Sequence, residues 1–293
     1  MESLSCEICK NPTFLCNCDS TWTSFNLLKN RGKTNDKITF TDINVSTITV
    51  CFKYNQSINL PYFYENRPKF IDMTYKPSAK KAKEKKKKGT DSFYNSFEIK
   101  MAILDREINA FSNISIYLFP NGKIKIAGSK TVNVVHSTIE ELTDIINYVE
   151  GSIDDHSNLV AENIKIQMIC SDFKVKPIKD DTDGWCIKQE VLKNILVNDY
   201  HLSATFSALS KYPGINLKYP SVNDENKPVS IFIFRSGSII ITGAKDAKDI
   251  LSCYEFINKV IYKSHSFIFY YDINEELKQK KKKNKITKQL NLK

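Results

Sequence analysis

Four cysteines near the N-terminus have a spacing that could hold a metal ion. Cys6, Cys9, Cys16 and Cys18 form C-x-x-C followed by C-x-C within thirteen residues. Four soft thiolates placed so closely can make a small tetrahedral zinc site, although C-x-C bends awkwardly around one metal. The alternative is a flexible tail with free thiols. Two interpretations of residues 1–35 therefore stay open, and no other cofactor is indicated.

The other reactive residues do not gather into a catalytic pattern. The remaining cysteines are scattered, as is typical of reduced thiols in an intracellular protein: Cys51, Cys170, Cys186 and Cys253. The histidines have neither metal-ligand nor nucleophile–base spacing: His136, His156, His201 and His265. The acidic run at residues 180–183 is typical of a solvated turn. We therefore expect no enzyme activity.

Positive charge is concentrated in two segments. The 293 residues carry a net charge of +10, but residues 80–88 contribute +6 and residues 278–293 contribute +8, which leaves −4 elsewhere. Such runs are normally solvated, and each lysine close to a phosphate releases a counterion. A polyanion partner is one interpretation, and a nuclear-import signal or a solubility tail are the others.

The composition excludes two classes of protein. With 41% hydrophobic and 11% aromatic residues the chain can bury real cores, which excludes wholesale disorder. No stretch approaches the roughly 20 apolar residues of a membrane span. The first ten residues, MESLSCEICK, contain no apolar run, so we expect no secretory signal.

An internal repeat is the strongest signal in the sequence. Residues 114–130, ISIYLFPNGKIKIAGSK, match residues 229–245, VSIFIFRSGSIIITGAK, at a constant offset of 115. Both have alternating strands around a two-residue turn. We expect positive φ at Asn121-Gly122 and at Ser236-Gly237, as in hairpin turns.

Each hairpin leads into a predicted amphipathic helix. Apolar residues step by three and four in the first helix (Val135, Ile139, Leu142, Ile146 and Val149) and in the second (Ile250, Tyr254, Ile257 and Ile261). Ser137 with Glu140 predicts a capping box, and Asp246 predicts an N-cap.

The upstream segments pair in the same way. Strands are predicted at 41–54 and 171–177, helices at 58–64 and 187–198, and further strands at 97–104 and 215–219. The fold class is thus α+β, with each half running strand, helix, three strands, helix. The first repeat would cover 36–160 with a Lys-rich insertion at 72–95, the second 161–272, and a basic tail 273–293.

Strand alternation divides each hairpin into two faces. In copy two, Phe232, Phe234, Ile240 and Thr242 lie opposite a face of isoleucines. In copy one, the corresponding face holds Tyr117, Phe119, Lys123, Lys125 and Ala127. This face carries aromatic and β-branched residues with some lysines, unlike the polar solvent-facing side of an ordinary one-sided sheet. It predicts a partner surface, unless a second layer of structure covers it.

These residues resemble the TATA-box-binding protein family. The resemblance rests on F-R-S-G-S-I-I-I-T-G-A-K, on the Y-P-G motif at residues 212–214 and on the twofold repeat, and it spans about 40–150 and 170–265. It implies a saddle: one curved antiparallel sheet from two pseudo-symmetric repeats, with helices on the convex face and DNA under the concave face. The divergence and the abundant Lys, Asn and Ile point to a large DNA virus or a protist.

The resemblance also implies roles for individual residues. The family, a standard example of minor-groove wedges, kinks DNA by inserting paired aromatic side chains. The matching residues are Tyr212 and Phe234 in copy two, and Phe119 with Phe97 in copy one, where Phe70 competes with Phe97.

Other positions match the DNA-binding residues of the family. Phosphate contacts are implied for Lys123, Lys130, Lys218 and Lys245, a minor-groove contact for Asn44, and DNA binding for Tyr117, Lys125, Phe232, Ile240 and Thr242. Some positions depart from the family. Ser238 replaces a lysine, the second groove asparagine falls near Pro177, and residues 208–211 lack the acidic side chains that engage the B-type initiation factor.

The implied function is a transcription initiation factor that binds and bends A/T-rich promoter DNA through the minor groove. Its implied partners are double-stranded DNA, RNA polymerase and general initiation factors, with no membrane. The implied location is the nucleus, or a cytoplasmic viral factory or virion if the protein is viral. The alternative is a saddle-fold protein-interaction module with weakened or lost DNA binding. In a DNA-binding protein, the two basic segments would compensate for weakened contacts by non-specific attraction to phosphates.

Overall fold

The computed structural model describes residues 24–76, 96–106, 109–178, 184–222, 224 and 226–278. Within them the chain forms two units: unit 1 holds 45–169, and unit 2 holds 24–44 and the residues from 170 onward. The long strand β8 (Ala161–Pro177) contributes to both units. The N-terminal cysteines, residues 80–88 of the basic insertion and the basic tail from residue 279 lie outside the described residues.

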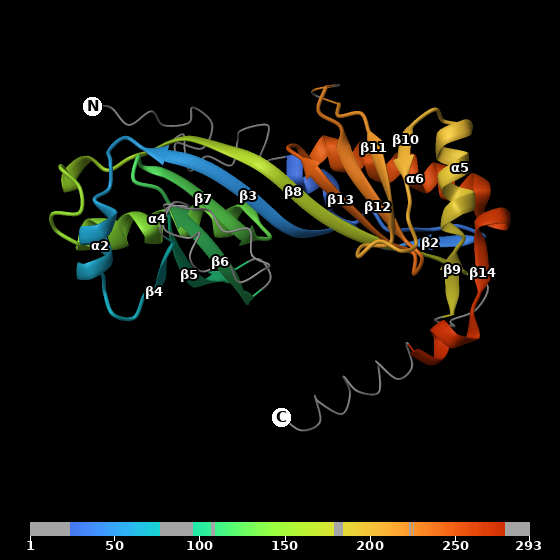
Figure 1. The fold of residues 1–293 in the computed structure, drawn as a ribbon, viewed down its shortest axis with the longest axis horizontal. Coiled ribbons are helices and arrows are strands. Elements are labelled where there is room, and N and C mark those ends of the chain that lie inside the picture. The colour runs from blue at the N-terminus through green and yellow to red at the C-terminus, as the bar shows by residue number, and fades with distance from the viewer. Residues whose placement is uncertain are drawn as a thin grey trace. The chain divides into compact units, whose positions relative to one another are not determined.

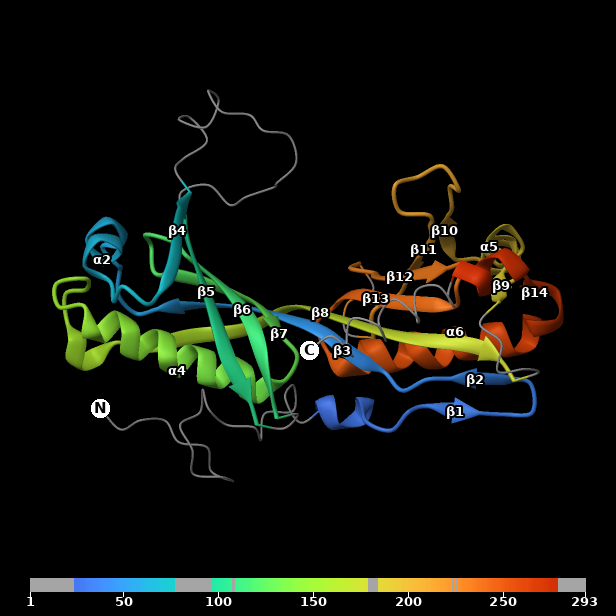
Figure 2. The same ribbon diagram turned by 90° about the horizontal axis from the view of Figure 1, so that it is seen from below.

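Unit 1 is an antiparallel sheet with a long helix on one face (Figures 1 and 2). Its strands follow the order β8-β3-β7-β6-β5-β4, to which β8 contributes its first half. The elements are β3 (Asn44–Tyr54), α2 (Leu60–Asn66), β4 (Asp72–Lys76), β5 (Ser96–Asp105), β6 (Ala110–Leu118), β7 (Lys123–Ser129), α4 (Val132–Tyr148) and the short 3-10 helix η3 (His156–Asn158).

Helix α4 packs its apolar stripe against strands β5 and β7. Val135, Ile139, Leu142 and Ile146 are all at most 2% exposed, as their spacing predicts. The start of this helix was predicted wrongly. Thr131 is the N-cap and its side chain accepts a hydrogen bond from the Val134 amide, so the Ser137–Glu140 pair lies inside the helix.

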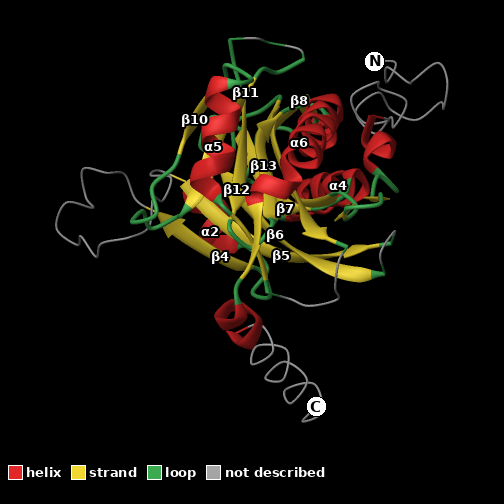
Figure 3. Cartoon of the chain, turned by 90° about the vertical axis from the view of Figure 1, so that its right-hand side faces the viewer, coloured by secondary structure: helices red, strands yellow, loops and turns green. Residues whose placement is uncertain are grey.

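Unit 2 is also built from an antiparallel sheet and helices (Figure 3). Its sheet order is β10-β11-β12-β13-β8, β2 also pairs with β8, and β9 pairs separately with β14. The elements are η2 (Ser24–Leu28), β1 (Lys33–Thr34), β2 (Ile38–Phe40), β9 (Trp185–Ile187), α5 (Gln189–Asn198), β10 (Ser203–Thr205), β11 (Gly214–Tyr219), β12 (Val229–Phe234), β13 (Ser238–Ala244), α6 (Ala247–Ile268) and β14 (Phe269–Tyr271).

Helix α6 covers strands β12 and β13 and also contacts β2. Asp246 caps it as predicted, accepting a hydrogen bond of 2.8 Å from the Lys248 amide. Tyr254 is fully buried, and its hydroxyl donates to the carbonyls of Arg31 and Thr41 at 2.8 and 3.1 Å. This helix therefore ties the residues before β3 into the core of unit 2.

The turns of the two hairpins have the same geometry. Gly122 and Gly237 adopt φ of 74° and 77°, and each carbonyl accepts a hydrogen bond of 2.9 Å, from the Tyr54 and Val175 amides. A Cβ at either glycine would lie within 2.4 Å of a backbone carbonyl oxygen. The positive φ expected at Asn121 and Ser236 is absent, since in each turn only the glycine adopts it.

The predicted α+β class with antiparallel strands is confirmed. The strand predicted at 171–177 begins ten residues earlier, and the short strands β1, β2, β4, β9, β10 and β14 were not predicted. Among the described residues, no helix is long and apolar enough to cross a membrane.

Candidate nucleic-acid interface

Both hairpins bury one face and leave the other accessible. On the helix side, each of eight residues is at most 1% exposed: Ile116, Leu118, Ile124, Ile126, Ile231, Ile233, Ile239 and Ile241. On the opposite side, which we call the open face, Lys123 is exposed and seven residues are half-buried: Tyr117, Phe119, Lys125, Phe232, Phe234, Ile240 and Thr242. The predicted division into two faces is therefore confirmed.

Three aromatic rings form a cluster on the open face of unit 2. The ring of Tyr212 lies 4.9 Å from that of Phe234 and 5.5 Å from that of Phe232, both edge-to-face, and Tyr212 is 53% exposed. Such pairs add about 0.5–1.5 kcal/mol beyond burial, so the rings hold one another in place. Gly214 makes room for the cluster, because a Cβ there would meet the Phe234 ring at 3.0 Å.

A buried glutamine fixes the backbone that carries this cluster. Gln189, at the start of α5, is 8% exposed, and its amide donates to the carbonyl oxygens of Pro213 and Ile233 at 2.9 and 3.0 Å. These carbonyls precede Gly214 and Phe234. Because a buried carbonyl needs a donor, the glutamine ties the Tyr212 loop to strand β12. Nothing in the sequence alone marked this residue.

The lysines implied for DNA binding are accessible. Lys130 and Lys245 are exposed just before α4 and α6, and Lys218 is exposed on β11, where its ammonium donates to the Ser230 hydroxyl at 2.7 Å. The Lys125 ammonium lies 5.9 Å from the centre of the Tyr117 ring. Tyr117 in turn donates to Glu98 at 3.1 Å, so an acidic group also borders this face.

Asn44 is exposed, but its amide nitrogen is already engaged. It donates to both carboxylate oxygens of Asp172, at 2.8 and 3.2 Å. Strand β8 thus places a negative charge beside the asparagine that the sequence resemblance assigns to the minor groove. A carboxylate there opposes the approach of a phosphate-rich duplex.

Phe97 does not lie on the open face, contrary to the sequence-based expectation. It pairs with Leu118, so it shares the buried face; it is 4% exposed and its ring lies 5.3 Å from that of Tyr64. The competing residue Phe70 is 85% exposed, in the turn before β4. A one-residue difference in register moves a side chain to the other face, which explains the error.

The open face of unit 1 contains a hollow of about 830 Å³. Phe119 borders it, and its polar lining comes from β3, the β6–β7 turn, β7 and β8: Lys53, Asn121, Lys123, Lys125, Asn163, Lys165 and Gln167. Four of these residues escaped the sequence analysis. Alternation along residues 41–54 would have placed Lys53 on this face, whereas the β8 residues precede the predicted strand. Burial raises the pKa of the adjacent Cys51 thiol, an effect that Lys125 partly offsets.

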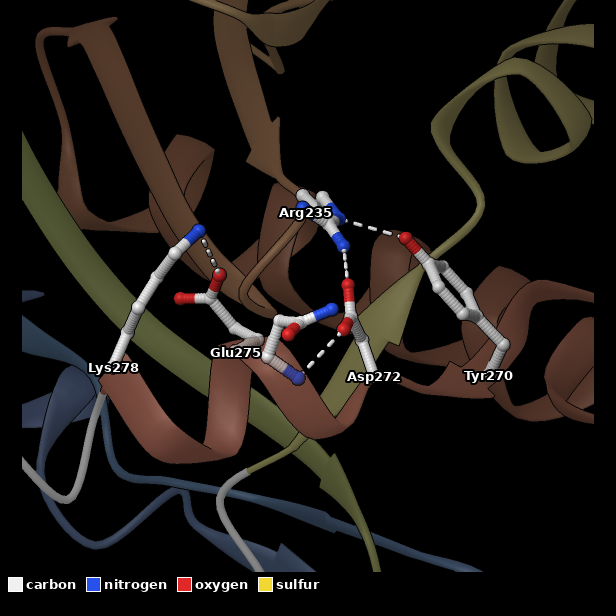
Figure 4. A network of polar contacts seen from close by, with 6 residues as sticks. Arg235, Tyr270, Asp272, Glu275 and Lys278 are labelled. Carbon is white, nitrogen blue, oxygen red and sulfur yellow. Dashed lines mark hydrogen bonds and ion pairs between the residues drawn. The ribbon is translucent and has the colours of Figure 1, made fainter.

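Polar contacts hold the start of the basic tail beside the hairpin of unit 2 (Figure 4). Arg235, next to Phe234, donates to the Tyr270 hydroxyl at 2.7 Å and forms an ion pair with Asp272. Asp272 accepts from the Asn274 amide at 2.9 Å, and this bond, with the one from Arg235, lowers its pKa. The chain therefore enters its C-terminal basic segment from a fixed point.

The described residues offer no metal centre. Among them, no three His, Cys, Asp or Glu side chains gather closely enough to bind an ion. Cys51, Cys186 and Cys253 are free thiols. The zinc prediction for Cys6, Cys9, Cys16 and Cys18 concerns residues outside the described part of the chain.

Comparison with curated proteins finds a "TATA-box-binding protein-like" protein of Acanthamoeba polyphaga mimivirus, 28% identical over 270 residues, which cover 81% of this chain and 70% of that protein. Among solved structures, the TBP of Methanococcus jannaschii matches with a TM-score of 0.48 and 15% identity, over 76% of this chain and 99% of that chain. No model of a known protein family matches. The resemblance to TATA-box-binding proteins is confirmed by the viral relative.

Proposed function

We propose that this protein is a TATA-box-binding-protein-like transcription initiation factor that binds and bends A/T-rich promoter DNA through the minor groove. One observation carries the proposal: the aromatic cluster of Tyr212, Phe232 and Phe234 lies on the open face and is at least partly exposed to solvent. Apolar and aromatic side chains suit the minor groove, where A·T pairs lack the guanine amino group. The mimivirus relative supports this assignment by its name.

In this proposal the two units are pseudo-symmetric halves of a saddle, with helices on its convex face. The wedge pair of unit 2 is Tyr212 with Phe234. In copy one, Phe119 is a wedge, and the exposed Phe70 is the candidate for its mate because Phe97 is buried. Lys123, Lys130, Lys218 and Lys245 would position the duplex by its phosphates.

The further parts of the proposal follow the resemblance. Bound DNA would recruit RNA polymerase and general initiation factors, in the nucleus or, for a viral protein, in a cytoplasmic factory or the virion. No catalytic step is assigned to the protein. The basic segments at residues 80–88 and 278–293 would strengthen binding without reading sequence, so deleting both should flatten its salt dependence.

A binding assay on labelled A·T-rich and G·C-rich duplexes of equal length tests the proposal. We expect preference for the A·T-rich duplex, bending seen by energy transfer between its ends, and a loss of about 1–3 kcal/mol of binding free energy in Phe119→Ala and in Phe234→Ala. Phe267→Ala and Tyr148→Ala are matched controls, because these exposed rings lie on α6 and α4, on the helix side.

A second function has support of its own. The Asn44–Asp172 contact and the absence of lysine at Ser238 favour a protein-interaction module with weakened DNA binding. Binding that ignores both base composition and the two phenylalanine substitutions would support this alternative and contradict the first proposal.

A further inference from the structure

The hollow in unit 1 is lined by four lysines from three strands. Lys53 comes from β3, Lys123 and Lys125 from β7, and Lys165 from β8. No Asp or Glu is among its lining residues. Within the described residues, Lys53, Lys123 and Lys165 form no ion pair, so their charges are not neutralised by the fold.

The strand register brings like charges together. Lys53 lies directly opposite Lys123 in the β3–β7 ladder, and Cys51 lies opposite Lys125. Like charges at directly opposite positions destabilise a sheet. This pair therefore costs stability in the isolated protein, and an anion bound between the two ammonium groups would offset that cost.

Charge is also separated across the sheet of unit 1. Helix α4, on the other face, contains no lysine or arginine and exposes Glu140, Glu141 and Asp144. Burial and these two acidic neighbours raise the pKa of Glu141, as expected where the acids lack nearby cations. Unit 1 is thus basic over the hollow of its open face and acidic on the exposed side of α4, which orients the hollow toward a polyanion.

The size and lining of the hollow favour an extended anion. A volume of about 830 Å³ exceeds what one small ion needs, and the lysines are spread over neighbouring strands about 4.8 Å apart. Asn163 and Gln167 add amide donors along β8, and Phe119 adds an aromatic ring at the border. A charged groove beside an aromatic side chain is the usual combination for a nucleic-acid strand.

We propose that this hollow binds the phosphodiester backbone of nucleic acid, with Lys53 and Lys165 as phosphate-binding residues. The inference rests on the proposed DNA-binding function and adds that the two units contribute differently to affinity and to base preference. The hollow of unit 1 adds phosphate contacts that contribute affinity without reading sequence, while the aromatic cluster of unit 2 contributes the preference for A·T pairs.

The test measures the salt dependence of binding to the A·T-rich and the G·C-rich duplex by the full chain. The double variant Lys53→Gln/Lys165→Gln should lower the slope of log K against log salt by about 1.8, since each lost phosphate contact removes about 0.9. Affinity should fall by the same factor on both duplexes. The control Lys248→Gln/Lys259→Gln removes two exposed lysines from α6 and should leave the slope unchanged.

A stability measurement separates binding from folding. Removing Lys53 relieves the like-charge pair, so the urea midpoint of Lys53→Gln should equal or exceed that of the parent protein while its DNA affinity falls. A lower midpoint accompanied by an unchanged slope would overturn the inference. So would binding of polyglutamate that depends on Lys53 and Lys165 as strongly as DNA binding does, because the partner would then be an acidic protein.

The two proposals can fail separately. If the parent protein prefers A·T-rich DNA but the lysine variants keep its slope, the proposed function stands and this inference is wrong. If the protein shows no A·T preference and the lysine variants still lower the slope, the phosphate site stands and the minor-groove function is wrong.

Discussion

The two hairpins share a turn and a buried face, yet their open faces differ in chemistry. Unit 1 has Lys123 and Lys125 where unit 2 has Ser238 and Ile240. The glycine turn is the same in both, and so are the buried isoleucines except that Leu118 stands in place of Ile233. The fold depends on the buried face, so the open face can change without loss of structure. One scaffold can therefore present a basic surface in one unit and an apolar one in the other.

The largest effect is expected from the shared turn. Alanine at Gly122 or Gly237 would force a Cβ into a backbone carbonyl as well as into positive φ. Each substitution should lower the free energy of unfolding by at least about 3 kcal/mol, measured by urea denaturation. The control Gly243→Ala also has positive φ but open space around it, so about 1–2 kcal/mol is expected.

Unequal losses of unfolding free energy at the two turns would contradict the claim that the two hairpins share one turn geometry. If Gly122→Ala were tolerated while Gly237→Ala unfolded unit 2, the two hairpins would not depend on the same geometry.

Much of this fold could be predicted because side chains in a strand alternate with a period of two. Isoleucines at alternate positions of each strand, at residues 231, 233, 239 and 241, marked the buried face, and the offset of 115 transferred this pattern to unit 1. The apolar stripes of α4 and α6 could be predicted equally well, from their spacing of three and four residues. These signals are local, since each needs only a few neighbouring residues.

The errors arose where long-range pairing decides the outcome. Phe97 lies on the buried face because it pairs with Leu118, a register that the sequence does not contain. The first half of β8 was missed because its burial pattern changes phase between Ile166 and Ile169, and Asn163 adopts a φ of 54°. The lysine hollow joins three strands that are far apart in sequence, so no local pattern could reveal it.

The aromatic cluster of unit 2 depends on an anchor that can be removed. Gln189→Leu should leave the carbonyls of Pro213 and Ile233 without their donor, which costs about 1–3 kcal/mol of unfolding free energy. The same variant should reduce the preference for A·T-rich DNA, because the Tyr212 loop is released from β12. The matched control is Gln167→Leu in unit 1, where the side chain is exposed and a change within about 0.5 kcal/mol is expected. Intact A·T preference in Gln189→Leu would show that the cluster needs no such anchor.

Exchanging the open-face residues sharpens the comparison directly. Lys123→Ser/Lys125→Ile gives unit 1 the residues of unit 2, and the salt slope should fall by about 1.8. Ser238→Lys/Ile240→Lys makes the reverse change, so the slope should rise and the A·T preference should fall. Salt-dependent binding to both duplexes measures the outcome. Equal slopes of log K against log salt in the parent protein and both variants would mean that the two open faces do not differ in their phosphate contacts.

The smallest effect is expected in the pH dependence of stability, where α4 and α6 differ at one position. His136 in α4 is 9% exposed and burial lowers its pKa below the ordinary 6.5, whereas the residue 115 positions later in α6 is Leu251. The unfolded chain then binds a proton that the folded chain resists, so stability is highest above pH 6.5 and declines as the pH falls below it. Urea denaturation at about pH 7.5 and 5.5 should show a smaller decline in His136→Leu than in the parent protein. An equal decline in stability in both proteins would mean that protonation of His136 does not destabilise α4, and that this histidine does not distinguish the two helices.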